Sequence, residues 1–554
     1  MTEDRPPLKY AALRAMLSFK YGGRYQTLLN ATGNPRAAQA ALLRRILVTN
    51  ANTHFGARYK FMQVKDPEAY QSAVPIKSYE DLRKYVEAQE RTGEPYLTAD
   101  RPVYYHRTSG TLGAAKDIPV TEAGLRRVKE NQQLFAYSVA KGTRAFEGQV
   151  FGITGQAVEG LMPAGLPYGS ASGLLYKRMS NLVRKKYVLP PEVADIPDYE
   201  SRYFATAAHA LAEPNVTGLG TANPSTLVRL LDLIRSEPEA LIQALHDGRL
   251  PQGADKPLEV KLPRKRRRAR QLDRLLTARG SLTYADIWPS LKGIMTWTGG
   301  SCSVPLRRLA DSISAETAII ELGYIASEFQ GTVNINAIEN VCVPTLLDNF
   351  FEFAERTAWE GGAKEDFLLL DELEEGGEYY IFVTTQDGLY RYDMNDIVRV
   401  TRKINATPCL EFVQKGKGVT SITGEKLYEN QVLDAVMKVM TRQSVSPQFF
   451  VMLADPEAAS YTLYIEAPEH DPFRSFDLAN EVDSGLRAVN IEYDSKRGSG
   501  RLAPTELKWL HSGAGAEYRA NRVAAGQRDA QFKYLHLQYA QECPFDFDAH
   551  AEPG

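Results

Sequence analysis

The residues best suited to chemistry lie in one short stretch, residues 104–121, with the sequence YYHRTSGTLGAAKDIPVT. A β-prone lead-in is followed by a loop of small and hydroxyl residues and then by a single lysine. Glycine lets the backbone approach an anion closely, N–H groups and hydroxyls donate to phosphate oxygens, and lysine supplies positive charge. The stretch predicts a polyphosphate site, whose donors would come from Thr108, Ser109, Gly110, Thr111 and Lys116.

This loop does not follow the Walker A pattern, which requires GxxxxGK[ST]. Gly110 and Gly113 precede Lys116 by six and three residues, so the spacing differs. The alternative for the loop is an ordinary surface connection, because a lone Gly/Ser/Thr loop is a weak signal. Other segments have to decide between the two interpretations.

Two further segments have the form of an apolar strand that ends in a turn of small residues: WPSLKGIMTWTGGS at 288–301 and AIIELGYIASEFQG at 318–331. In open α/β sheets, ligands bind beyond the carboxyl ends of the strands. Tyr324 would stack on a base there. Glu328 would hold Mg²⁺, which takes one or two carboxylates and keeps its remaining waters. Taken alone, Glu328 also fits an ordinary surface carboxylate.

Two other loops have candidate roles with alternatives that stay open. Asp396 lies where the apolar run LYRYDMNDIVRVTR breaks, and it would accept hydrogen bonds from ribose hydroxyls or serve as a structural cap of a turn. Residues 151–173 are dense in glycine, proline and serine. Such a loop either lines a pocket where a ligand approaches the backbone or simply connects two elements.

The elements that must position these loops alternate between helix and strand. Apolar spacing predicts helices at 36–48, 78–86 and 122–140, and Ser78 with Asp81 fits a capping box. The run NVTGLGTA reads as a buried strand that leads into a helix from Asn223. A strand followed by a helix is a βα unit, which predicts an α/β fold with a mixed or parallel sheet.

The length, composition and net charge of the chain argue against several classes of function. A chain of 554 residues predicts at least two domains, and 44% hydrophobic residues can build a sizeable core. The net charge of −2 argues against nucleic acid or a membrane as partner, and the basic run at 261–270 is interpreted as a solvated helix face rather than a nucleic-acid site. The N-terminus is polar and does not resemble a signal peptide, which predicts a cytoplasmic location. The four cysteines are scattered, and we expect them to be free thiols there.

The amino-acid composition of the chain changes after Phe412. The segment VQKGKGVTSITGEK suits a hinge, and it divides the chain into a large domain, 1–413, and a small mobile C-terminal domain, 414–554. Beyond the hinge the pattern predicts a helix at 430–441, strands at 449–453 and 461–466, a helix at 477–489 and a strand at 506–510. This order predicts a two-layer α/β domain with helices on one face of the sheet.

Taken together, the segments resemble the adenylate-forming enzymes, and most closely the acyl acid–amido synthetases that conjugate auxin and jasmonate in plants and have bacterial relatives. The resemblance covers nearly the whole chain in order. It is carried by the loop from Thr108 to Lys116, YIASE at 324–328, LYRYDMND at 389–396, the hinge from Phe412 to Lys426, and QFK at 531–533. The chain departs from the family at Lys415 or Lys417, where arginine is usual, at Asn395, where glycine is common, and after Lys533.

The resemblance implies a ligase that uses ATP and Mg²⁺, converts a small carboxylic acid to an acyl-adenylate, and transfers the acyl group to an amino acid or amine. It implies catalytic roles for Lys533, Glu328 and Lys415, with Glu328 as the metal ligand. The nucleotide would be bound by Thr108, Ser109, Gly110, Thr111, Lys116, Gly299, Gly300, Tyr324, Ser327 and Asp396. The acid would be bound near Phe151, Tyr168, Ser170 and Gly173.

Two alternatives to this interpretation stay open. The adenylate could pass to CoA or a carrier thiol, or the chain could be a decayed nucleotide-binding relative. A monomer or weak dimer is expected, without nucleic-acid or membrane partners.

Overall fold

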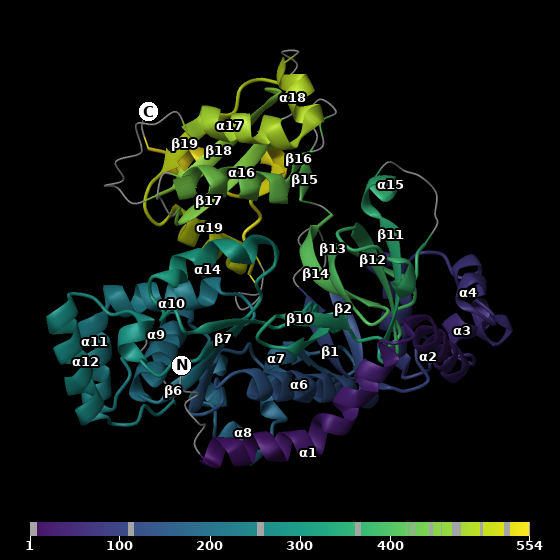
Figure 1. The fold of residues 1–554 in the computed structure, drawn as a ribbon, viewed down its shortest axis with the longest axis horizontal. Coiled ribbons are helices and arrows are strands. Elements are labelled where there is room, and N and C mark those ends of the chain that lie inside the picture. Colours follow the sequence, from purple (N-terminus) through teal and green to yellow (C-terminus); the bar gives the residue numbers. More distant parts are fainter. Residues whose placement is uncertain are drawn as a thin grey trace. The chain divides into compact units, whose positions relative to one another are not determined.

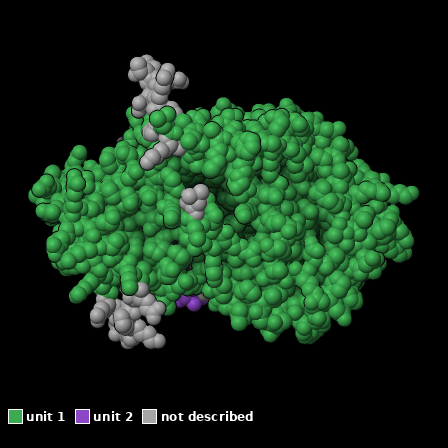
Figure 2. Space-filling model, turned by 90° about the horizontal axis from the view of Figure 1, so that it is seen from below, with its two compact units in different colours: residues 1–298, 309–394, 398–411 green, residues 299–308, 395–397, 412–554 purple. Residues whose placement is uncertain are grey.

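The computed structural model comprises two compact units. Figure 1 shows the fold of the chain, and Figure 2 shows a face on which nearly all the visible surface belongs to unit 1, in green. Unit 1 comprises residues 1–298, 309–394 and 398–411, and unit 2 comprises residues 299–308, 395–397 and 412–554. The predicted division after residue 413 stays a prediction. The structure describes residues 8–108, 116–251, 260–360, 367–416, 418–420, 422, 425, 427–442, 447–455, 457–467, 478–498, 502–525 and 532–552.

A four-stranded parallel sheet forms one half of unit 1, in the order β3-β6-β7-β8. Its strands are β3 Gln149–Gly152, β6 Val216–Gly220, β7 Gly293–Thr296 and β8 Ala318–Glu321. The helices α9 Tyr199–Ala212, α10 Ser225–Ser236, α11 Pro238–Asp247 and α13 Tyr284–Ile287 share one hydrophobic core with this sheet (Figure 1). The predicted βα unit, with its parallel sheet, is confirmed.

Two more sheets complete unit 1. The first has the order β2-β1-β5-β4 and consists of β1 Pro102–Thr108, β2 Lys116–Thr121, β4 Gly160–Leu161 and β5 Pro167–Gly169. The other has the order β11-β12-β13-β14 and consists of β11 Asn349–Glu355, β12 Glu378–Thr385, β13 Tyr392–Ile404 and β14 Thr407–Lys415. A separate hairpin joins β9 Thr332–Asn336 to β10 Val341–Pro344.

The predicted helices of unit 1 are confirmed. They correspond to α2 Pro35–Thr49, α5 Tyr79–Thr92 and α6 Glu122–Gly142. Ser78 and Asp81 form the expected capping box, because the Ser78 N–H donates to the Asp81 carboxylate at 2.8 Å and the Asp81 N–H to Ser78 Oγ at 3.4 Å. Shorter or further helices are α1 Leu8–Ala31, α3 His54–Arg58, α4 Pro67–Ala73, α7 Ala171–Lys177, α8 Asn181–Arg184 and α15 Arg356–Glu360.

Residues 266–270 of the basic run form the start of α12 Arg266–Arg279 and residues 261–265 precede it; the cations of the run are exposed except for Arg268. Arg268 is buried and donates to the carbonyl oxygens of Leu211 and Ile287 at 3.0 and 2.8 Å. The prediction of a solvated helix face is therefore confirmed for Arg266, Arg267 and Arg270. Arg268 instead joins α12 to the core, since its guanidinium satisfies two buried carbonyl groups.

Unit 2 is built on a four-stranded sheet in the order β19-β18-β17-β20. The strands are β17 Phe449–Asp455, β18 Ser460–Glu466, β19 Glu506–Leu510 and β20 Leu537–Tyr539, and the predicted strands and helices are confirmed. The helices of unit 2 are α16 Glu429–Arg442, α17 Leu478–Val489, α18 Ile491–Gly498 and α19 Ala514–Ala524, and residues 303–308 of α14 Ser303–Ala310 also belong to this unit.

The expectation of helices on one face of this sheet is wrong. Phe450 and Met452 face a core shared with α16 and α17, while Phe449 and Val451 face a second core that contains Tyr518 of α19. Both faces are covered because β17 is apolar at nearly every position, as expected of a strand buried on both sides.

Two further features concern membrane-spanning helices and cysteines in the described residues. No helix among them is both long and apolar enough to cross a bilayer. The four cysteines all lie in described segments and form no disulfide with one another.

Candidate functional site

The predicted phosphate loop connects two paired strands, β1 and β2. Their antiparallel register places Thr108 opposite Lys116 and His106 opposite Ile118. Ser109, Gly110 and Thr111 lie outside the described residues, and only the backbone of Thr108 is described. The strand pair therefore fixes the two ends of the predicted loop.

Residues 323–332 form a second hairpin just after β8. The N–H groups of Gly331 and Thr332 donate to the carbonyl oxygen of Tyr324 at 2.8 and 3.1 Å, and the Ala326 N–H donates to Phe329 O at 2.9 Å. These bonds leave residues 327–328, the predicted α-phosphate and metal residues, at the tip. Gly323 has a φ of +93°, and a Cβ there would lie 2.9 Å from Thr332 O, so the turn requires glycine.

The two hairpins meet at the predicted site. Nδ1 of His106 lies 3.0 Å from the carbonyl oxygen of Ser327, and Nζ of Lys116 lies 4.0 Å from Oε1 of Glu328. Lys116 also donates to the hydroxyl of Tyr392 at 3.1 Å. The structure thus brings Lys116, Ser327 and Glu328 together, although more than 200 residues separate β1 from the second hairpin.

The carboxyl ends of β7 and β8 are tied together by Glu321. Its carboxylate accepts from the N–H of Thr298 at 2.6 Å and from the N–H of Gly323 at 2.8 Å. Burial raises the pKa of Glu321 above its ordinary value. This bonding holds the turns after both strands in place, at the edge of the sheet where ligands of α/β folds bind.

Tyr324, the predicted base-stacking residue, is largely buried. Its ring meets Phe329 edge-on at 5.4 Å, and a Cβ on Gly331 would lie 2.5 Å from the ring. Gly331 therefore packs directly against the tyrosine ring and fixes its orientation. The stacking role of Tyr324 stays a prediction.

The predicted acid-binding residues have mixed environments. Phe151 has no exposed surface and packs 5.9 Å from Trp288 in a hydrophobic core of unit 1, and its role in binding the acid stays a prediction. Tyr168 faces the guanidinium of Arg107, whose Cζ lies 3.6 Å from the ring centroid. Arg107 is in turn paired with Asp117 at 2.7 Å.

Ser170 and Gly173 have clear structural tasks. Ser170 is the N-cap of α7 and accepts from the Gly173 N–H at 3.0 Å. A Cβ on Gly173 would lie 2.3 Å from Gly155 O, so glycine is needed for this close approach. The loop at 151–173 is thus packed on itself, and a role in binding the acid stays a prediction for these residues.

Two further predicted site residues, Gly300 and Lys533, lie near Phe412 in unit 2. A Cβ on Gly300, which has a φ of +57°, would lie 3.0 Å from Val413 O and 3.4 Å from the Phe412 ring. Nζ of Lys533 lies 4.8 Å from the centroid of the same ring. Gly299 adjoins this turn, whereas the side chain of Lys415 and residue Lys417 lie outside what the structure describes.

Asp396 is buried in unit 2 beside a residue with unusual backbone geometry. Asn395 has a φ of +48°, and its carbonyl oxygen accepts from the Gly416 N–H at 2.9 Å. Left-handed backbone favours glycine and is tolerated by asparagine. The asparagine that replaces the family's usual glycine is therefore compatible with the same turn.

Lys533 is carried by a segment that is anchored by a buried carboxylate. Oε1 of Glu429, at the start of α16, accepts from the His536 N–H, and Nδ1 of His536 donates to Phe450 O at 2.7 Å. Burial raises the pKa of Glu429 to about 7, with the nearby charge of Lys533 opposing that rise, and burial lowers the pKa of His536 to about 4.

The donor set at the hairpin tip fits a magnesium–phosphate group better than a protein-only metal cage. No cluster of three or more His, Cys, Asp or Glu occurs among the described residues. Glu328 supplies one largely buried carboxylate beside the cation of Lys116. One carboxylate suits Mg²⁺, which takes its other ligands from phosphates and water.

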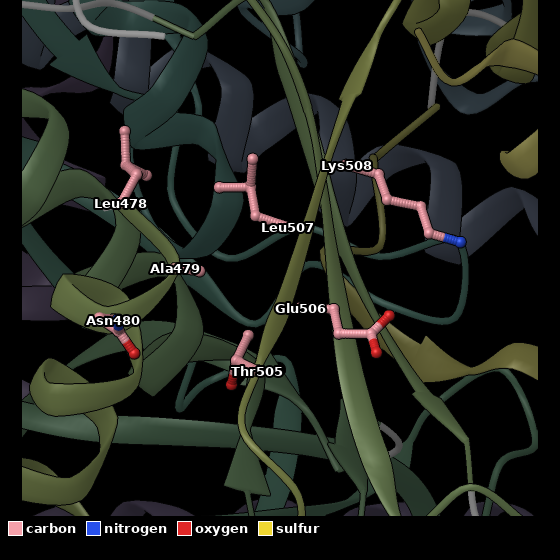
Figure 3. Close-up of a pocket in the computed structure, with 7 residues that line it drawn as sticks. All are labelled: Leu478, Ala479, Asn480, Thr505, Glu506, Leu507 and Lys508. Atoms are coloured by element: carbon pink, nitrogen blue, oxygen red, sulfur yellow. The ribbon is translucent and has the colours of Figure 1, made fainter. Parts of the chain in front are cut away.

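A groove of about 470 Å³ in unit 2 is separate from these residues (Figure 3). Figure 3 shows Thr505 and Leu507 directed toward α17, with Glu506 and Lys508 on the other side of β19. None of the predicted site residues lines it; its lining consists of Leu478, Ala479, Asn480, Thr505, Glu506, Leu507 and Lys508.

Sequence reasoning missed four neighbours of the site. These are His106, which contacts the hairpin tip, Tyr392, which binds Lys116, and Phe412 and Glu429, which lie near Lys533. The sequence contains one indication of the role of His106. In a strand, alternate residues face the same side, so His106 is expected on the same side as Tyr104 and Thr108.

Comparisons with known proteins cover most of the chain. Models of the GH3 family match as the N-terminal domain at 24–316, the central domain at 342–415 and the C-terminal domain at 430–542. The 4-substituted benzoates-glutamate ligase GH3.12 of Arabidopsis thaliana is 25% identical, over 91% of this chain and 93% of its own length. The jasmonoyl–L-amino acid synthetase GH3.5 of Oryza sativa is 24% identical, over 91% and 92%.

Solved structures show the same fold. The GH3.15 acyl acid amido synthetase in complex with 2,4-DB has a TM-score of 0.82 at 22% identity and covers 96% of both chains. The 2-hydroxyisobutyryl-CoA ligase with 2-HIB-AMP has a TM-score of 0.54 at 13% identity, covering 94% of this chain and 90% of its own. The predicted fold class, with its adenylate-forming architecture, is confirmed.

Proposed function

This chain belongs to the GH3 family, and from that membership and the site above we propose that it is an ATP-dependent acyl acid–amido synthetase. A carboxylic acid attacks the α-phosphate of ATP to give an acyl-adenylate and pyrophosphate. The amino group of an amino acid or other amine then attacks the acyl carbon, which gives an amide and AMP. The observation that carries the proposal is the meeting of Lys116 with the Ser327–Glu328 hairpin tip.

The side chains of unit 1 would bind and orient the triphosphate. Lys116 and the loop that precedes it would neutralise the outer phosphates, and Ser327 would donate to the α-phosphate. Mg²⁺, when bound, would withdraw charge from the phosphate oxygens, and Glu328 would hold it. Because such transfers depend mainly on positioning and charge stabilisation, fixed donors on two hairpins suit the reaction.

The residues of unit 2 would complete the reaction. Asp396 would accept from the ribose hydroxyls, and Gly299 with Gly300 would admit the adenine to the backbone. Lys533 would donate to the charge that develops at the α-phosphate, with Lys415 as a second cation. Tyr168 of unit 1 is the candidate for contact with the acid.

Pyrophosphate exchange into ATP tests the first half-reaction with a panel of carboxylic acids. Exchange with at least one acid is expected, and the variant Glu328→Ala should lose it while retaining the wild-type unfolding temperature. Glu339→Ala, which removes an exposed carboxylate, is the matched control and should keep full exchange. Full exchange in Glu328→Ala would refute the metal role of that carboxylate.

Mass spectrometry of the products tests the second half-reaction. With the active acid, ATP and a mixture of amino acids and CoA, an amide is expected rather than a thioester. A thioester as the only product would replace the amide ligase with the CoA alternative.

A further inference from the structure

His106 is a buried residue of β1, in the lead-in to the predicted phosphate loop, and the sequence assigns it no role. Its Nδ1 lies 3.0 Å from the carbonyl oxygen of Ser327, and its ring packs edge-on against Tyr104 at 5.6 Å. A carbonyl oxygen can only accept, so the proton resides on Nδ1 and the imidazole donates to the hairpin tip.

The tip needs such a contact because the internal bonds of the hairpin stop short of it. The backbone bond nearest the tip runs from the Ala326 N–H to Phe329 O, which leaves the peptide between residues 327 and 328 beyond the ladder. β1 reaches this peptide with His106, and two residues later the same strand enters the predicted phosphate loop. One strand therefore sets both the loop and the tip.

We propose that His106 is a positioning residue for adenylate formation: it holds the Ser327 carbonyl and so fixes Ser327 and Glu328 relative to the phosphate loop. The inference rests on the proposed function for its substrate, ATP with Mg²⁺. Positioning of this kind matters because a displacement of about 1 Å can cost about a hundredfold in rate. The role is indirect, since His106 acts through the hairpin.

Three substitutions separate the hydrogen bond from the bulk of the ring. In His106→Asn, the amide nitrogen occupies the place of Nδ1 and can donate to Ser327 O. In His106→Gln the amide lies one bond further out, and in His106→Leu there is no donor. The matched control is His209→Leu, which alters a buried histidine of α9 that has no role in the site.

Calorimetry of ATP binding with and without Mg²⁺ gives the first readout in the full chain. His106→Leu and His106→Gln should lose about tenfold or more of the affinity that Mg²⁺ adds, since the part-buried Ser327 carbonyl is left without this donor and the hairpin tip is no longer held. His106→Asn and His209→Leu should keep it. The inference is overturned if the Leu and Gln variants keep the wild-type gain, or if Asn loses as much as Leu.

Hydrogen exchange of residues 324–332 without nucleotide gives the second readout. Exchange should be faster in the Leu and Gln variants and unchanged in the Asn variant. The two readouts separate the hypotheses: a wild-type chain that bound no ATP would overturn the proposed function, whereas normal ATP binding with unchanged exchange in His106→Leu would overturn this inference alone.

Discussion

The buried carboxylate of Glu429 makes a quantitative prediction about stability and pH. Burial raises its pKa from 4.5 to about 7. A carboxyl group with a raised pKa binds its proton more tightly in the folded state, so its favourable contribution is present below pH 4.5 and is lost as the pH rises through about 7. Because each tenfold change in acidity is worth about 1.4 kcal/mol, the ionised group costs about 3 kcal/mol at pH 8.

The substitution Glu429→Gln removes the charge and keeps an oxygen that accepts from the His536 N–H. The variant should therefore be more stable than the wild type by about 3 kcal/mol at pH 8, and the difference should approach zero near pH 4.5. Burial lowers the pKa of His536 to about 4, so protonation of this residue reduces stability at low pH. This loss of stability occurs in both proteins and cancels in the difference between them.

Urea titrations at pH 5.0, 6.5 and 8.0 would measure this difference in the full chain. Because two units need not unfold together, the unfolding of unit 2 is followed by pulsed hydrogen exchange of β17 at one labelling pH. Glu457→Gln, which alters an exposed carboxylate after the same strand, is the control and should change nothing at any pH. A stability difference between Glu429→Gln and wild type that did not vary with pH would refute the reasoning.

Three further predictions concern residues of both units. Glu352→Ala should destabilise unit 1 by about 3–5 kcal/mol in urea unfolding, because it leaves Arg391 buried without its carboxylate partner. Glu339→Ala, which breaks an exposed ion pair, should cost less than about 1 kcal/mol. Equal losses of stability in the two variants would contradict the role of burial. Asn395→Gly should match the wild type in unfolding, while Asn395→Val should lose about 1–2 kcal/mol at its left-handed φ, and a stable Val variant would contradict the strain. Lys533→Met should slow pyrophosphate release in a single turnover by about a hundredfold with ATP affinity retained, and an unchanged rate would remove Lys533 from catalysis.

The sequence alone determined the elements whose signals are local. Helices such as α2 and α5 follow from apolar spacing and from the Ser78–Asp81 capping box, which act within a few residues. The motif types also depend on local order, so the loop before Lys116 and the YIASE segment could be identified with the adenylate-forming family from their residues. The apolar run at 449–453 predicts a strand, but the expectation of helices on only one face of its sheet was wrong.

Only the tertiary structure decided which of these residues meet. His106 and Ser327 are 221 positions apart, and Glu429 and His536 are 107 apart, so each contact depends on how whole sheets and helices pack. The same packing placed Phe151 in a core and the sheet of unit 2 between two helical layers. Periodicity tells which side of an element is apolar, but it does not contain the distance or direction to a distant partner, and these set the geometry of the site.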